Sequence, residues 1–374
     1  MKSFVDLSEL TVVIPTVSRP LFVIRQFEYW RELNAQVVIL DGAMEPIDIP
    51  TELKSSNIHY MHTGTRFNER LATAGQHVST KYCALLPDDE FYLPSGMRAA
   101  IDKLEEDPEI IGCVGRCLYF FVDQGRFLVK DAYRDWLPFP DEVTTVQHRL
   151  DVDLPPVKTH KAQFAIMRSG QWKTMFEGSY SQYFSCGYTY ERLLNLQRSV
   201  LGRTEILEDV LWMRSMENPP ISNASVPRVD GRDFVSWARN PKFALEVRQY
   251  RQIALGMIQS GGVTAEEAEA FEERFFVGGV HRQATKAERS SKKLSRRLGN
   301  VALTRTPKIL RLVAKRLLPA RWLRFTGWEG YDLDAMCASL QSRGTRFSRP
   351  ELERIRELSI KLDQQIRFQR KTAK

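Results

Sequence analysis

The sequence predicts an α/β protein built on a doubly wound, mostly parallel sheet with a C-terminal helical extension. Short apolar runs alternate with segments of helical apolar spacing through roughly the first third of the chain. Such alternation is typical of parallel strands joined by helices. Past residue 240 the pattern becomes almost wholly helical. We therefore expect an α/β domain over residues 1–235 and a basic helical extension over residues 236–374.

The elements of the N-terminal part follow from these runs in chain order. Each expected strand is a run of about five residues that stops close to a proline, a glycine or an acidic residue. Each expected helix has apolar side chains three or four residues apart. The strands are expected at residues 11–15, 36–40, 58–62, 82–86 and 110–115, and the helices at residues 20–33, 66–79 and 95–106.

The periodicity fades in the middle of the chain. Prolines indicate loops between residues 123 and 157. Two capping boxes mark helix starts further on, one from Thr264 to Glu267 and one from Ser348 to Glu351, because hydroxyl and carboxylate can satisfy free backbone N–H groups reciprocally. Helices are expected at residues 163–176, 188–200 and 349–370.

Composition excludes several classes of protein. Residues Met1–Leu10 contain two acidic residues and no long apolar stretch, so a signal peptide is not expected. No run of about 18 apolar residues occurs, so no membrane-spanning helix is expected. The five cysteines form no CxxC pair, which indicates buried thiols in a reducing compartment and no zinc site. These features predict a cytoplasmic protein.

Polar side chains gather where three of the expected strands end. Thr16 and Arg19 follow the first strand, Asp41 follows the second, and the acidic run 88–90 follows the fourth. Because ligands of a doubly wound sheet bind at the carboxyl ends of its strands, we expect these residues to face one crevice. A solvated turn is the alternative interpretation of residues 88–90, with Glu90 merely preceding the next helix.

The stretches TVVIPTVSRP, VVILDG, TRFNERLATAG and LLPDDEFYLP occur in this order. Together they resemble the nucleotide-sugar-binding half of family-2-like glycosyltransferases of the GT-A (Rossmann-like) fold. The resemblance covers roughly residues 10–120, which would form the donor half, with an acceptor half at about 121–235. It implies a metal-assisted, inverting transfer from a nucleotide-diphosphate sugar. The implied acceptor is a glycan, a lipid-linked acceptor or another surface-polysaccharide acceptor.

The resemblance also implies roles for particular residues. Asp89 would bind Mg²⁺ or Mn²⁺, and Asp88 would contact the ribose or reach the metal through water. Two departures weaken this metal site: Pro87 replaces the first aspartate of the usual motif, and Asp41 is followed by Gly42-Ala43 instead of Gly-Ser. The residues expected to bind the nucleotide sugar are Pro15, Thr16, Arg19, Asp41, Arg66 and Asp88.

An inverting transfer needs a carboxylate that accepts the proton of the attacking hydroxyl. Asp209, in the pair Glu208-Asp209, is the residue the resemblance favours as this base. The alternative is that residues 204–214 form a strand or helix whose acids face water, with Glu177 and Glu191 as other candidate bases. Two further function classes stay open. One is a binding protein with a degenerate transferase fold, and the other is a sugar-phosphate nucleotidyltransferase.

The positive charge of the chain is concentrated in one segment. Residues 281–325 contain fourteen Lys and Arg against one acid, or +13, whereas the whole chain is +8, so the remainder is about −5. Within this segment, residues 305–325 have the spacing of a basic amphipathic helix. Packing on the catalytic domain comes first among its expected roles and peripheral binding to an anionic membrane second. Nucleic-acid binding is not expected, because no stacking aromatics are interleaved with the charges.

Overall fold

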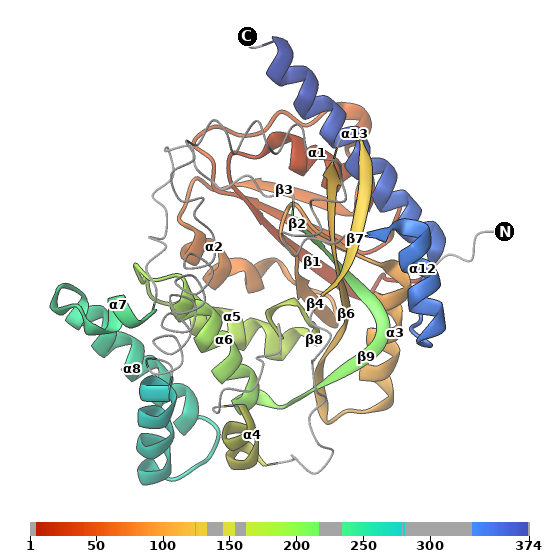
Figure 1. The fold of residues 1–374 in the computed structure, drawn as a ribbon. Helices are drawn as coiled ribbons and strands as arrows, with labels where there is room; N and C mark the ends of the chain where they lie inside the picture. The colour runs from red at the N-terminus through yellow and green to blue at the C-terminus, as the bar shows by residue number, and fades with distance from the viewer. Residues whose placement is uncertain are drawn as a thin grey trace, which may run out of the picture.

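In the computed structural model, a ten-stranded sheet forms the centre of the protein, with helices on both faces (Figure 1). Its main strand order is β10-β7-β6-β8-β4-β1-β2-β3, while β9 pairs with β5 and β6. The structure describes residues 5–123, 125–132, 145–153, 162–216, 234–278, 280 and 331–372.

The strands and helices have the following bounds. The strands are β1 (Leu10–Thr16), β2 (Gln36–Asp41), β3 (Ile58–His62), β4 (Tyr82–Leu85), β5 (Phe91–Tyr92), β6 (Ile110–Asp123), β7 (Arg126–Ala132), β8 (Ile166–Arg168), β9 (Arg203–Ser215) and β10 (Tyr331–Asp332). The α-helices are α1 (Pro20–Trp30), α2 (Phe67–Thr73), α3 (Pro94–Glu106), α4 (Val146–Asp153), α5 (Ser169–Tyr180), α6 (Tyr188–Leu201), α7 (Phe234–Arg239), α8 (Ala244–Gln259), α12 (Leu333–Ser342) and α13 (Arg349–Thr372). A further helix spans residues 265–278.

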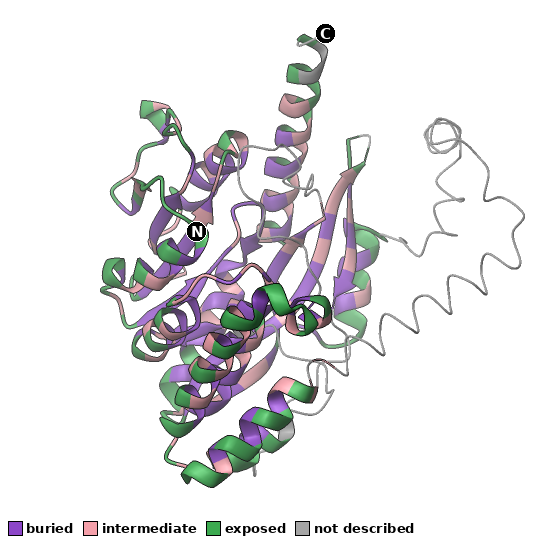
Figure 2. Ribbon diagram, turned by 90° about the vertical axis from the view of Figure 1, so that its left-hand side faces the viewer, coloured by how far each residue is buried: buried purple, intermediate pink, exposed green. Residues whose placement is uncertain are grey.

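The alternation of side chains along β1 explains why both faces are covered. Val12 and Ile14 enter a hydrophobic cluster with residues of α1, α3 and α13. Val13 points to the opposite face, into a second cluster with α2, α5, α6 and α8. Figure 2 shows the resulting pattern, with buried residues along the strands and exposed residues on the outer helix surfaces. The predicted doubly wound α/β fold class is confirmed.

The N-terminal strands confirm the predicted parallel arrangement. β4, β1, β2 and β3 are neighbours in that order, and each pair is parallel. The second half of the sheet is mixed, because β8 runs antiparallel to β4 and β6, and β7 runs antiparallel to β6. The strands β7 and β8 and the helix α4 were not predicted. Strand β8 and helix α4 are short elements whose contacts are with distant segments, so local periodicity carries little signal for them. Strand β7 forms a hairpin with β6, from the pair Asp123 and Arg126 to the pair Cys117 and Ala132, in the stretch where prolines predicted loops.

Two other predictions need correction. Residues 163–176, expected to be one helix, form a 3₁₀ turn, strand β8 and the start of α5. Ile166 and Met167 are buried between β4 and β6, so pairing with both neighbours overrides the helical spacing. Residues 204–214 belong to strand β9, which lies inside the sheet and is largely buried, so the helical alternative for them is wrong.

The C-terminal part of the chain returns to the N-terminal domain. β10 pairs with β7 at one edge of the sheet, and α13 lies along α1 (Figure 1). Side chains of α12 and α13, including the buried Met336, Leu352 and Ile355, belong to the same hydrophobic cluster as β1. In the described residues, the predicted boundary near residue 235 therefore does not separate two packed units.

Polar contacts tie α13 to the rest of the domain. Glu351, predicted to belong to a capping box, accepts hydrogen bonds from the backbone N–H and the hydroxyl of Ser95, at 3.1 and 2.7 Å. Ser95 lies in the first turn of α3, so a residue of α13 caps that helix. Lys361 pairs with Glu28 of α1 at 2.6 Å. The other predicted capping box is confirmed, with Thr264 and Glu267 bonded in both directions.

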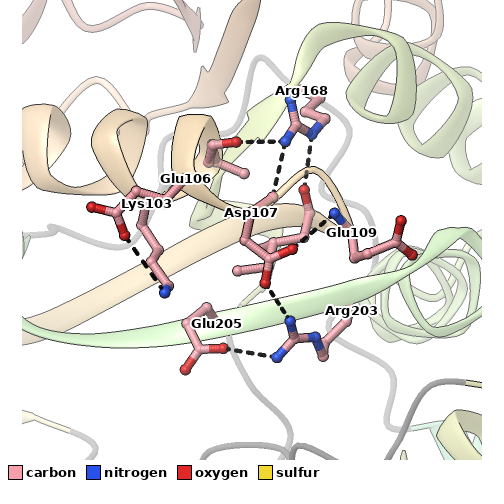
Figure 3. A network of polar contacts seen from close by, with 9 residues as sticks. Lys103, Glu106, Asp107, Glu109, Arg168, Arg203 and Glu205 are labelled. Atoms are coloured by element: carbon pink, nitrogen blue, oxygen red, sulfur yellow. Dashed lines mark hydrogen bonds and ion pairs between the residues drawn. The ribbon is translucent and has the colours of Figure 1, made fainter.

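A separate polar network joins the amino ends of β6 and β9 (Figure 3). Arg168 donates to the backbone carbonyls of Ile110 and Asp107, at 2.9 and 3.1 Å. Arg203 pairs with the Asp107 carboxylate at 2.6 Å and with Glu205 at 3.4 Å. These side chains hold the turn between α3 and β6, at the sheet edge opposite the strand ends that carry the candidate site.

The basic segment 281–325, with its expected amphipathic helix at residues 305–325, lies outside the described residues. Within the described part of the chain, no helix has the length and apolarity needed to cross a membrane.

Candidate functional site

The predicted strand-end residues meet at the point where the strand order reverses. The chain passes from β1 outward through β2 to β3, and β4 then returns to the other side of β1. Thr16 at the end of β1, Asp41 at the end of β2 and Asp88 beyond β4 are all buried there. Crevices at such reversal points are the usual ligand sites of doubly wound sheets. Pro15 lies beside them on β1, in register with Leu40.

Asp88, Asp89 and Glu90 form what we call the acidic turn, closed by a 3.1 Å hydrogen bond from the N–H of Glu90 to the carbonyl of Pro87. The three residues are 3%, 2% and 5% exposed. The solvated-turn alternative is therefore wrong. Pro87, which replaces the first aspartate of the motif that the sequence resembles, opens this turn, a position at which it needs no N–H.

Asp88 is held by both predicted neighbours. Its Oδ2 accepts a 2.6 Å hydrogen bond from the Thr16 hydroxyl, and its Oδ1 accepts a 2.5 Å ion-paired bond from Arg19 Nη1. Burial raises the pKa of Asp88 to about 6, although the Arg19 guanidinium lowers it, and the charge of Asp89 raises it further. Both Asp88 oxygens are thus occupied by groups of the protein itself.

Two side chains of helix α1 donate hydrogen bonds to the backbone carbonyls of the acidic turn. The Gln26 amide donates to the carbonyls of Asp88 and Glu90 at 2.9 and 2.8 Å. Arg25 donates to the carbonyl of Asp89 at 2.8 Å. Both side chains are almost completely buried, and their roles were not predicted. A signal existed for Gln26, because residues 22, 26 and 30 recur at helical spacing on the buried face of α1.

Glu90 reaches across to β9. Its Oε2 accepts a 2.6 Å hydrogen bond from Trp212 Nε1, and its Oε1 lies 3.6 Å from Nε of Arg214. Burial and the charge of Asp89 raise the pKa of Glu90 well above its ordinary value. The prediction that Glu90 merely precedes the next helix is wrong, since its side chain is buried and α3 begins only at Pro94.

Asp41 forms a second polar group on the other side of β1. It is fully buried and accepts hydrogen bonds from the backbone N–H of Ala43 at 2.9 Å and from the Tyr60 hydroxyl at 2.6 Å. The Tyr60 hydroxyl in turn accepts from the N–H of Ile47 at 2.7 Å. Burial and the hydrogen bond to Asp41 raise the pKa of Tyr60 to about 12, so this hydroxyl keeps its proton and orients the carboxylate.

The arginine of this group is Arg70, not the predicted Arg66. Arg70 is 4% exposed, and its Nη1 donates to the carbonyls of Thr16 and Leu40 at 2.5 and 2.7 Å. Its Nε is buried and makes no hydrogen bond. Arg66 is exposed, precedes α2 as its N-cap residue and lies over the ring of Tyr183 at 5.3 Å. The two arginines are one helical turn apart, so sequence spacing alone does not distinguish them.

Gly42 makes the position of Arg70 possible, since a Cβ there would lie 2.5 Å from Arg70 Cζ. We expect Gly42→Ala to displace the guanidinium and to lower the free energy of unfolding by about 1–3 kcal/mol, because the carbonyls of Thr16 and Leu40 would lose a buried donor. Any ligand of this crevice should bind at least about 10-fold more weakly, measured by calorimetry. Gly170→Ala is the control, because a Cβ there would meet nothing within 4 Å. If Gly42→Ala binds the ligand as tightly as wild type, Arg70 has no role in ligand binding.

The structure does not bring Asp209 to the acidic turn. Asp209 lies three residues before Trp212, about 10 Å back along β9. Its two oxygens accept hydrogen bonds from Arg346, at 3.0 and 2.6 Å. The other candidate bases, Glu177 and Glu191, are exposed on α5 and α6. A catalytic role for Asp209 stays a prediction that these contacts do not support.

A divalent metal ion does not fit the acidic turn as it is arranged. Asp89 Oδ2 is a buried carboxylate oxygen without a hydrogen bond, and Arg19 Nη2 lies 3.3 Å from it. An ion bonded to that oxygen at about 2.1 Å would lie close to the guanidinium and be repelled by it. In the part of the chain that the structure describes, no group of three His, Cys, Asp or Glu side chains is arranged to hold a metal.

Comparisons with known proteins give distant structural similarity alone. No family model matches the sequence, and no curated protein is significantly similar to it. The crystal structure of S. aureus TarS 1–349 in complex with UDP-GlcNAc is 11% identical, with a TM-score of 0.41, over 71% of each chain. A longer S. aureus TarS structure is also 11% identical, with a TM-score of 0.35, over 72% of this chain and 55% of that one. Such distant similarity supports no inference about what this chain binds.

Proposed function

We propose that this protein is a glycosyltransferase that takes a sugar from a nucleotide-diphosphate donor. The observation that carries the proposal is the pair of polar groups on either side of the β1 end. Asp41 and Arg70 form one, and the acidic turn with Thr16 and Arg19 forms the other. These residues lie in the stretches that resemble family-2-like glycosyltransferases, with departures at Pro87 and Ala43 and with Arg70 in place of Arg66.

The two groups suit the two ends of a nucleotide diphosphate. Arg70 keeps a buried N–H without a hydrogen bond, and Asp41 is an oriented acceptor. Burial lowers the pKa of Arg70, and the nearby charge of Asp41 offsets part of that effect, so together the two side chains can read the edge of a planar base. Arg19 is a planar guanidinium that matches phosphate oxygens. A buried donor without a partner is costly, which a ligand acceptor would relieve.

In the proposed reaction, the acceptor hydroxyl oxygen forms a bond to the anomeric carbon of the donor sugar. The bond from that carbon to the diphosphate oxygen breaks, and its electron pair stays on the diphosphate. The acceptor proton passes to a base that the described residues do not identify. The products are a glycoside and a nucleoside diphosphate. A nucleotidyltransferase would release pyrophosphate instead, so product analysis separates the two classes. The acceptor is proposed to be a glycan or a lipid-linked glycan.

The donor-site proposal is tested by thermal denaturation of the full-length protein with a panel of UDP-, GDP-, ADP- and dTDP-sugars. At least one should raise the melting temperature, because ligand binding to the native state alone stabilises it. Arg70→Met should lose most of that rise. Arg98→Gln is the charge-matched control, since Arg98 pairs with Asp102 on the outer surface of α3. No rise with any nucleotide sugar would refute the proposal.

Peripheral binding to an anionic membrane remains a proposal that rests on the +13 segment. Replacing Arg311, Lys315, Arg316 and Arg321 together by Gln should reduce sedimentation with phosphatidylglycerol vesicles at low salt, by at least about fivefold. A matched variant removes the same charge elsewhere, at Lys54, Lys103, Lys242 and Arg248, and should bind vesicles like wild type. Equal losses in the two variants would show that the net charge of the protein matters and not this segment.

A further inference from the structure

We propose that the guanidinium of Arg19, and not a bound divalent ion, is the cation that meets the donor diphosphate, so that donor binding needs no metal. The inference rests on the proposed function and concerns the same site. It starts from the position of Arg19 between the two aspartates of the acidic turn. Nη1 lies 2.5 Å from Asp88 Oδ1, and Nη2 lies 3.3 Å from Asp89 Oδ2. A metal ion shared by these carboxylates would occupy the same space.

The backbone before α1 directs Arg19 to this place. Ser18 has a φ of 53°, and it is the one residue other than glycine with a positive φ in the described chain. A serine pays a small conformational penalty there, which the surrounding structure must offset. Arg19 follows directly and precedes Pro20, the first residue of α1. The turn thus places the guanidinium at the carboxyl end of β1, beside the acidic turn.

Stacking holds the Arg19 side chain in one orientation. Its guanidinium carbon lies 4.1 Å from the centre of the Phe22 ring, and that of Arg25 lies 5.1 Å from the same ring. The Arg19 side chain is 14% exposed, so it reaches solvent while most of it is enclosed. A guanidinium already fixed in the site loses little further freedom when it binds a phosphate.

The charges of the acidic turn are matched without a metal. Arg19 lies within ion-pair distance of the Asp88 and Asp89 carboxylates, Arg214 lies 3.6 Å from the Glu90 carboxylate, and Arg25 donates to the backbone carbonyl of Asp89. The six side chains sum to zero when all are ionised. Three buried acids therefore do not require a dication to offset their repulsion.

Two of the unsatisfied buried atoms of the site lie on Arg19 and Asp89. Arg19 Nη2 and Asp89 Oδ2 are both buried and neither makes a hydrogen bond, although they are 3.3 Å apart. A phosphate oxygen that approached Nη2 would satisfy this donor and gain a charge-assisted hydrogen bond. As the sugar–phosphate bond breaks, charge builds up on that diphosphate, so the same contact would strengthen during the reaction.

The test measures donor affinity of the full-length protein by calorimetry, using the nucleotide sugar that gives the largest thermal shift. Titrations are run in EDTA and in excess Mn²⁺. The two wild-type dissociation constants should agree within about threefold, and the electron-paramagnetic-resonance signal of free Mn²⁺ should not fall when protein and donor are mixed. Affinity that is at least about 10-fold tighter with Mn²⁺, together with loss of the free-Mn²⁺ signal, would overturn the inference.

The variant Arg19→Gln should bind the donor at least about 10-fold more weakly than wild type in EDTA. Because this change also frees Asp88 and Asp89, Mn²⁺ should restore part of the affinity in this variant while adding nothing to wild type. Arg19→Lys keeps the charge without the planar fork. It should fold even if Arg19→Gln does not, and it should bind more weakly than wild type in EDTA. If Arg19→Lys binds the donor as tightly as wild type in EDTA, the planar guanidinium of Arg19 is not needed for phosphate binding and the inference is overturned.

Arg98→Gln is again the control and should match wild type under every condition. Failure of this inference and failure of the proposed function give different results. If no nucleotide sugar binds in EDTA or in Mn²⁺, the donor site itself is refuted. If binding appears only with Mn²⁺, the donor site stands and Arg19 does not replace the metal.

Discussion

Leu352→Ala is expected to lower the free energy of unfolding by about 2–5 kcal/mol, although the residue lies in the C-terminal helix, far along the chain from the N-terminal sheet. Leu352 is completely buried in the cluster that contains Val12 and Ile14 of β1. Replacing the Leu352 side chain by alanine would remove its apolar contacts and leave a cavity between α13 and the domain. Urea denaturation followed by circular dichroism measures the change.

Leu245→Ala is the matched control, because Leu245 is also helical but 60% exposed. Its unfolding free energy should stay within about 0.5 kcal/mol of wild type. A chain that ends at residue 280 should not give a cooperative unfolding transition, since all the buried side chains of α12 and α13 would be missing. Equal stability of Leu352→Ala and Leu245→Ala would mean that α13 does not contribute to the folded core.

Gln26→Leu is expected to have the second large effect, a loss of about 2–5 kcal/mol in the free energy of unfolding. The change leaves the carbonyls of Asp88 and Glu90 without their amide donor, and it removes the acceptor of Trp30 Nε1, which is 2.8 Å from Gln26 Oε1. Each buried polar group left unsatisfied costs roughly 1–3 kcal/mol. The acidic turn should also lose its position, so the remaining folded protein should bind nucleotide sugars at least about 10-fold more weakly.

Asn57→Leu separates these two effects. The Asn57 amide donates to the carbonyls of Trp30, Leu33 and Ala35, at 2.9 to 3.1 Å, so it is a buried backbone support of the same kind, away from the acidic turn. It should lower stability by a similar amount and leave donor affinity unchanged below its melting temperature. If both variants bind the donor like wild type, the support of the acidic turn by α1 has no role in binding.

The strand ends of the site could be predicted because they depend on local signals. β1, β2 and β4 are apolar runs with abrupt polar exits, and parallel strands bring their carboxyl ends to one edge of the sheet whatever the distant packing is. Thr16, Asp41 and Asp88 therefore lie where the sequence predicts. The family resemblance could also be recognised from the sequence, because it depends on the order of short motifs that lie near strand ends.

Which side chains pair with one another could not be predicted, because such pairs form between distant segments of the chain. Arg66 and Arg70 have the same spacing, and only the space above Gly42 selects Arg70 for the crevice. Asp209 has the local form of a catalytic acid, but Arg346, 137 residues further along the chain, pairs with it.

The burial of Glu90 depends likewise on Trp212, 122 residues away, and the support of α3 depends on Glu351, 256 residues from Ser95. The sequence by itself determined the sheet and the edge at which its polar residues meet, since periodicity and strand exits are local. Which charges lie against one another was decided only by the tertiary structure. The energy of a buried ion depends on every group packed around it, and those groups come from segments that no local pattern relates.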